Sequence, residues 1–166
     1  MMSVEALFLG ILVCAASGVF NKRAATSSES CDVSEDALKR KLGSICISDK
    51  PMLNVRYGRN NEFQCDETYS KSHTSSPPIK VSFNQAEAGE NLKSGTIEGT
   101  TLMGYYGPSP PSGSHRYQLV LFSSKTGPDV HLADENRSQF SLLNFVNLNS
   151  ESICSVVAVF QFQVPA

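Results

Sequence analysis

Two side chains able to bind a small anion, His115 and Tyr117, stand two residues apart in the segment 107–122, GPSPPSGSHRYQLVLF. Its first half is a stiff loop, because the prolines fix φ and lack a backbone donor while the glycines permit tight turns. Its second half, 116–123, is apolar on both faces, which predicts a central strand. If strand pairing begins at His115, both rings leave one face and Arg116 leaves the other.

A rigid rim beside an imidazole and a phenol indicates a small site that holds an anionic group by hydrogen bonds. The alternative is a proline-rich turn that enters a core strand. In that case His115 and Tyr117 would form their hydrogen bonds within the protein, at the edge of the strand, and would bind no ligand. On spacing alone, this second interpretation is the more economical one.

The sequence lacks the motifs that would indicate catalysis, nucleotide binding or a metal site. There is no G-x-S-x-G elbow, no H-E-x-x-H, no phosphate-cradling loop of the Walker kind and no C-x-x-C pair. The acidic pairs Glu35/Asp36 and Asp134/Glu135 are typical of solvated charges rather than of a catalytic acid and base. We therefore expect no enzyme, no metal and no cofactor.

Size and composition indicate one globular domain. The chain has 166 residues, of which 40% are apolar and 18% are charged. Its formal net charge of −2 gives no reason to expect a nucleic acid partner or strong attraction to anionic membranes.

The N-terminus is typical of a secretory signal. Residues 6–16 are apolar apart from Gly10, and this run is too short to span a bilayer as a helix. Small residues follow it, so we predict a signal peptide over residues 1–18, with cleavage between Ala16 and Phe20. The preceding region carries Glu5 and no Lys or Arg, which leaves a buried first helix as the alternative. No later stretch could cross a membrane, and we expect a secreted, extracellular protein.

Cysteine usage agrees with secretion. Cys14 would leave with the signal, and the four remaining cysteines predict two disulfides with three possible pairings, against the alternative of four buried thiols. These residues are Cys31, Cys46, Cys65 and Cys154. Asn136 opens the Asn-x-Ser sequon and is the predicted glycan acceptor.

Hydrophobic periodicity predicts a mainly β domain over residues 19–166 with about two short helices. One helix is expected to begin with Asp32 as N-cap and Glu35 completing a capping box, and to end at Gly43. The second is expected over 137–146. Strands are predicted at 52–57, 79–83, 96–106, 116–123, 130–132 and 153–164. This pattern fits a sandwich of antiparallel sheets.

Several of these segments resemble a known family. The segment 107–122 is similar to the second signature of the phosphatidylethanolamine-binding protein family, which joins a Gly/Pro-rich loop to His-Arg-Tyr and an apolar strand. The specific similarity begins upstream, over Leu92–Gly95 with Gly99 and Tyr105. Similarity is moderate over Arg137 with Phe140 and Phe145 and over the strand 156–163, and it is weaker over 53–58 and 79–83.

The resemblance implies an antiparallel β-sandwich of the phosphatidylethanolamine-binding protein type with a small surface pocket for phosphate-bearing head groups. His115 and Tyr117 would donate hydrogen bonds to phosphate oxygens, and Arg116 would face away and stabilise the loop from behind. The rim would consist of Gly107, Ser109, Pro110 and Pro111.

The chain departs from the family between residues 83 and 91. Only NQAEAGE lies between Phe83 and Asn91, where the family carries an Asp-Pro-Asp-x-Pro segment and a core strand. The domain is therefore expected to be incomplete there, with an open sheet edge. The chain is either a truncated or exon-skipped form or a lineage that rebuilt its sheet.

Two functions follow from the resemblance. The first is a secreted binding protein with a pocket for a phospholipid head group, such as a phosphatidylethanolamine-like ligand, or another small anion. The second is a non-catalytic interaction protein, or a protease inhibitor-like modulator, that contacts an extracellular protein and has a degenerate pocket.

Overall fold

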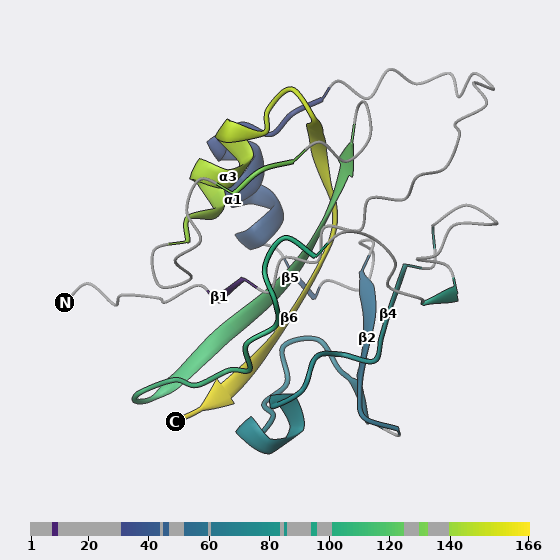
Figure 1. The fold of residues 1–166 in the computed structure, drawn as a ribbon, viewed down its shortest axis with the longest axis vertical. Helices are drawn as coiled ribbons and strands as arrows, with labels where there is room; N and C mark the ends of the chain where they lie inside the picture. Colours follow the sequence, from purple (N-terminus) through teal and green to yellow (C-terminus); the bar gives the residue numbers. More distant parts are fainter. Residues whose placement is uncertain are drawn as a thin grey trace.

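The computed structural model describes ten stretches of the chain: 8–9, 31–43, 45–46, 52–59, 61–83, 85, 94–95, 101–124, 130–132 and 140–166. Within them the protein is mainly β, with two three-stranded sheets and the helices α1 and α3 (Figure 1). The mainly β prediction with two short helices is confirmed.

The first sheet is built on one long antiparallel pair. β5 (Ser114–Ser124) pairs with β6 (Ile153–Pro165) from Ser114↔Pro165 to Ser124↔Ile153. On its other side, β5 pairs with the two-residue strand β1 (Phe8–Leu9). β5 is therefore central in this sheet, as its apolar faces predicted. The β1–β5 pair is parallel, a departure from the expected antiparallel arrangement.

The second sheet is antiparallel, in the order β3–β2–β4. β2 (Leu53–Tyr57) lies between β3 (Asn61–Phe63) and β4 (Lys80–Phe83), and its buried residues alternate with half-buried ones. The segment that follows β3 runs along the outer edge of β6, where the Asp66 amide donates to the Gln161 carbonyl at 2.8 Å. The edge of β6 from Gln161 to Gln163 is thus covered.

The two faces of the β5–β6 pair bury different partners. On one face, Tyr117, Leu119, Phe160 and Phe162 share a hydrophobic cluster with buried residues of β2, β3 and β4. The ring of Phe162 is central to this cluster, with centroid distances of 5.9 Å to Tyr57, 5.5 Å to Phe63 and 5.7 Å to Tyr117. Aromatic pairs at such distances stabilise the fold by more than the burial of their apolar area alone would give.

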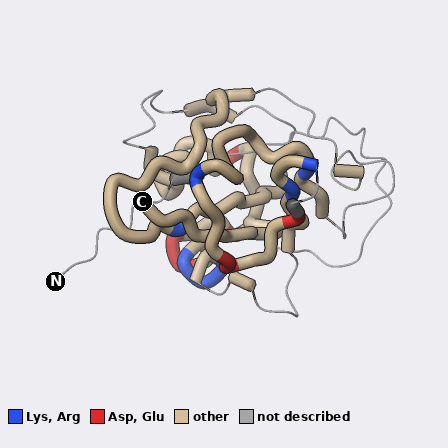
Figure 2. The backbone as a smooth tube through the Cα atoms, turned by 90° about the horizontal axis from the view of Figure 1, so that it is seen from below, with Lys and Arg blue, Asp and Glu red and all other residues tan. Residues whose placement is uncertain are grey.

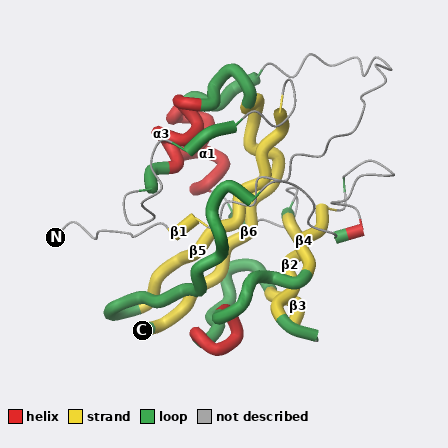
Figure 3. Tube along the Cα trace, in the orientation of Figure 1, coloured by secondary structure: helices red, strands yellow, loops and turns green. Residues whose placement is uncertain are grey.

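The helices pack on the opposite face of β5 and β6 (Figure 3). Val120 and Val159 contact a cluster that includes Leu38 of α1 (Glu35–Gly43) and Phe145 of α3 (Leu142–Leu148). The two clusters form on opposite faces because neighbouring residues of β5 point to opposite sides of the sheet.

The start of α1 differs from the prediction. Asp32 is not the N-cap: its carboxylate accepts from the Ser34 amide at 3.1 Å, and the Ser34 hydroxyl in turn accepts from the Ala37 amide at 3.3 Å. The Ser34 hydrogen bonds lower the pKa of Asp32. Ser34 caps the helix because it lies three residues before a free amide of the first turn. The predicted end at Gly43 is confirmed.

The second helix begins later than predicted. Ser141 is its N-cap and accepts from the Asn144 amide at 3.3 Å, so α3 spans Leu142–Leu148 rather than 137–146. Residues 137–139 lie outside the described residues.

Two strand predictions were wrong in the described part. Residues 130–132 form no strand, because the Asn149 side chain replaces a neighbouring strand: it accepts from the His131 amide at 2.7 Å and donates to the His131 carbonyl at 2.9 Å. Residues 101–106 are a loop. Conversely, β3 and the 3₁₀ helix η1 (Lys71–Thr74) were not predicted.

The four cysteines form two disulfides. Cys31 pairs with Cys154 across 123 residues, and Cys46 pairs with Cys65 across 19 residues. The first bridge ties the segment before α1 to the start of β6. Cys14 and Asn136, and all of the predicted signal except Phe8–Leu9, lie outside the described residues, so cleavage and glycosylation stay predictions. Among the described helices, none has the length and apolar character needed to cross a membrane.

Removing the longer bridge should destabilise the protein more than removing the shorter one. A disulfide restricts the unfolded chain in proportion to the logarithm of the loop that it closes, which gives about 5 kcal/mol for Cys31–Cys154 and about 3 kcal/mol for Cys46–Cys65. Urea denaturation of the paired Cys→Ser variants measures both losses. Equal losses, or the reverse order, would contradict this account.

Candidate ligand-binding site

The candidate site lies where the loop 105–113 enters β5. Pairing is regular here, with His115 opposite Val164 and Tyr117 opposite Phe162, so the imidazole and the phenol leave the same face. Arg116 is exposed and leaves the other face. The structure therefore brings the two rings together on one side of the strand, as spacing indicated.

The two rings differ in exposure. Tyr117 is only 4% exposed, and the Ser109 backbone lies close to its hydroxyl. Burial raises the pKa of the Tyr117 phenol, and the nearby Ser109 backbone partly opposes this rise. His115 is half-buried, and its Nδ1 is enclosed without a hydrogen-bond partner among the described residues. Only the imidazole keeps surface that a ligand could reach, whereas the phenol lies behind the rim.

The rim is anchored on η1, a contact that sequence reasoning missed. The Tyr105 hydroxyl donates to the Thr74 carbonyl at 2.6 Å, and Lys71 Nζ donates to the Pro110 carbonyl at 3.4 Å. Gly107 approaches the same turn so closely that an added Cβ would lie 2.8 Å from the Thr74 oxygen. The loop is therefore held by packing as well as by its prolines. A single 3₁₀ turn has no apolar period that would reveal it in the sequence.

The predicted rim residues have different surroundings. Pro110 is fully buried and Gly107 is half-buried, whereas Ser109 and Pro111 are exposed. Ser109 and Pro111 are thus the members that a ligand could touch.

Behind the rim, the phenols of Tyr57 and Tyr105 lie near each other. Tyr57 is buried and Tyr105 is half-buried, and the Tyr105 hydroxyl donates to the Thr74 carbonyl. Burial is the main cause that raises the pKa of both phenols, so both remain neutral donors over the physiological range. These two phenols connect β2 to the rim and to η1.

The charges of the described residues do not suggest a metal or polyanion site. In the described stretches, no three His, Cys, Asp or Glu side chains are grouped so that they could hold a metal ion. Figure 2 shows Lys/Arg and Asp/Glu interspersed along the described chain. In α1, for example, Lys39 Nζ lies 2.7 Å from Glu35 Oε1.

Comparison with known proteins assigns the family. A family model described as phosphatidylethanolamine-binding protein matches residues 59–152, which is more than half of the 166 residues and includes η1, the rim and β5. The chain belongs to the phosphatidylethanolamine-binding protein family. A search of curated proteins found no match.

The close approach at Gly107 generates a prediction. Gly107→Ala should destabilise the protein by roughly 1–3 kcal/mol, because the added methyl group meets backbone that must move. Thermal and urea denaturation measure the loss.

Gly43→Ala is the matched control, since nothing lies within 4 Å of its added Cβ. It should leave stability unchanged or slightly higher. Equal stability of the two variants would show that the rim is not anchored on η1.

Proposed function

We propose that this chain is a non-enzymatic binding protein that takes a phosphate-bearing phospholipid head group, or a similar small anion, at His115. The observation that carries the proposal is the position of the half-exposed imidazole beside an anchored rim. Family membership supports a binding rather than a catalytic role.

Each site residue has a distinct role in this proposal. His115 donates to a phosphate oxygen, and the exposed Ser109 and Pro111 border the ligand. Tyr117 supports the Ser109 backbone from behind instead of contacting the ligand, because its ring is buried. Lys71 adds a positive charge near the Pro110 carbonyl, which favours an anion there.

The proposal extends to the fold and the compartment. The shared cluster between the two sheets supports an antiparallel β-sandwich of the family type. Two disulfides and the predicted signal support a secreted, extracellular protein.

The expected ligand preference follows from the departure between residues 83 and 91. Because the Asp-Pro-Asp-x-Pro segment is absent from the sequence, no acidic side chain from it is available for a substrate amine. Binding should therefore depend on the phosphate, and inorganic phosphate and phosphoethanolamine should bind with similar affinity.

Calorimetric titration tests the proposal. Phosphoethanolamine should bind the wild-type chain, and His115→Ala should weaken the binding roughly tenfold or more, as expected when a hydrogen bond to a charged group is lost. His131→Ala is the matched control, because His131 is exposed and contacts Asn149 through its backbone. Its affinity should equal that of the wild type. No heat from the wild-type chain, or equal affinity of His115→Ala, would refute the proposal.

A further inference from the structure

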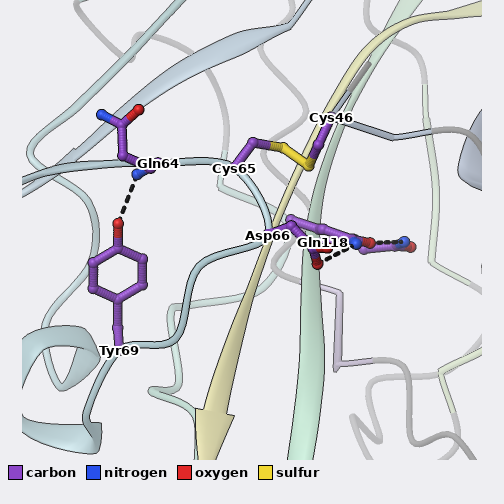
Figure 4. The surroundings of a disulfide bond; sticks show 7 residues. Cys46, Gln64, Cys65, Asp66, Tyr69 and Gln118 are labelled. Carbon is purple, nitrogen blue, oxygen red and sulfur yellow. Dashed lines mark hydrogen bonds between the residues drawn. A yellow bond between two sulfur atoms is a disulfide. The ribbon is translucent and has the colours of Figure 1, made fainter. Parts of the chain in front are cut away.

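A row of polar side chains crosses the first sheet on the face opposite Tyr117 and ends at the exposed Asp66. Gln118 of β5 donates through Nε2 to Gln161 Oε1 at 3.1 Å, and Gln161 Nε2 donates to Asp66 Oδ1 at 2.7 Å. Both glutamines are buried, at 5% and 7% exposure. Figure 4 shows this row, from Asp66 at one end to Gln118 at the other.

The acidic end of the row is held firmly. Asp66 follows Cys65, which is tied to Cys46, and the Gln64 amide donates to the Tyr69 hydroxyl at 2.6 Å (Figure 4). The Asp66 amide also donates to the Gln161 carbonyl. Asp66 is therefore a fixed acceptor.

This acceptor sets the direction of every hydrogen bond in the row. Since an ionised carboxylate only accepts, Gln161 must give its NH₂ to Asp66 and present its oxygen to Gln118. Gln118 must then give its own NH₂ to Gln161. Its Oε1 is left over: it is buried and has no hydrogen-bond partner among the described residues. A buried carbonyl without a donor is unfavourable, so the row requires one more donor.

We place the missing donor at the outer edge of β5, on the side of the strand away from Gln161. In the described part of the chain, this edge is paired only by β1, through Phe8↔Tyr117 and Leu9↔Gln118. β1 has two residues and β5 has eleven, so most of the edge has no strand beside it among the described residues. Such an edge readily accepts another strand.

We propose that the outer edge of β5 is a dimerisation surface, on which β5 of a second copy replaces β1 and pairs antiparallel about a two-fold axis through Gln118. The Gln118 amide is self-complementary, because Nε2 has a second hydrogen to give and Oε1 needs a donor. Two facing copies satisfy both atoms reciprocally, as an isologous interface demands.

The remaining side chains of β5 are compatible with this pairing. With Gln118 on the axis, Arg116 lies opposite Val120 of the second copy, so the two guanidinium groups do not face each other. Arg116 is the only Lys, Arg, Asp or Glu in β5. The strand therefore lacks the charges that usually keep sheet edges apart.

Sedimentation velocity of the full chain over a concentration series tests the proposal. The wild type should dimerise, and Gln118→Glu should weaken the dimer roughly a hundredfold, because two carboxylates would face each other across the axis. Gln163→Glu is the matched control: it lies on the same face but on β6, away from the edge, and the dimer should persist. Circular dichroism checks the fold of each variant.

A cross-link provides a second readout that is independent of the Gln118→Glu fold. Facing residues of antiparallel strands have Cβ atoms about 4.5–5.5 Å apart, close enough for a disulfide after small adjustment. Gln118→Cys should therefore give a covalent dimer on a non-reducing gel, whereas Gln163→Cys and the wild type should not. A monomer at all concentrations, a dimer insensitive to Gln118→Glu in a folded variant, or equal cross-linking at both positions would overturn the proposal.

Discussion

The structure depends on the antiparallel pairing of β5 with β6. Because this pair carries apolar side chains on both faces, it packs against the β2–β3–β4 sheet on one side and against the helices on the other. Phe162 fixes the first contact, since its ring meets aromatic side chains from β2, β3 and β5. A polar substitution at such a position would therefore disturb both sheets at once.

The candidate site is a consequence of that pairing. His115 and Tyr117 share the core-facing side of β5, so the ring nearer the middle of the strand is buried and the ring nearer its start stays half-exposed. The phenols of Tyr57 and Tyr105 then connect the rim to β2 and η1. A rim supported from behind in this way can present its backbone and His115 to a ligand with little loss of conformational entropy on binding.

The parts of the fold that follow from local periodicity were predictable. Residues 53–57 and 153–165 alternate or are continuously apolar, and their strands were predicted within one residue or so. Helix starts were less certain, because Asp32 and Ser34 are both good caps and only the tertiary position of the first turn decides between them.

Long-range contacts were not predictable. The sequence singled out four cysteines but left three pairings open, and nothing in it showed that the Asn149 side chain would replace a strand at His131. For the site, alternation placed His115 and Tyr117 on one face. The burial of Tyr117 depends on Ser109 and Phe162, which pack against it from the rim and from β6.

The most direct test of the account is the NMR spectrum of the three histidine rings during titration with phosphoethanolamine. His73 and His131 are exposed on other segments and serve as internal references. The account predicts that the His115 ring signals shift in a saturable way while the other two stay in place. If all three shift together, or if His115 does not respond, the candidate site does not bind this ligand.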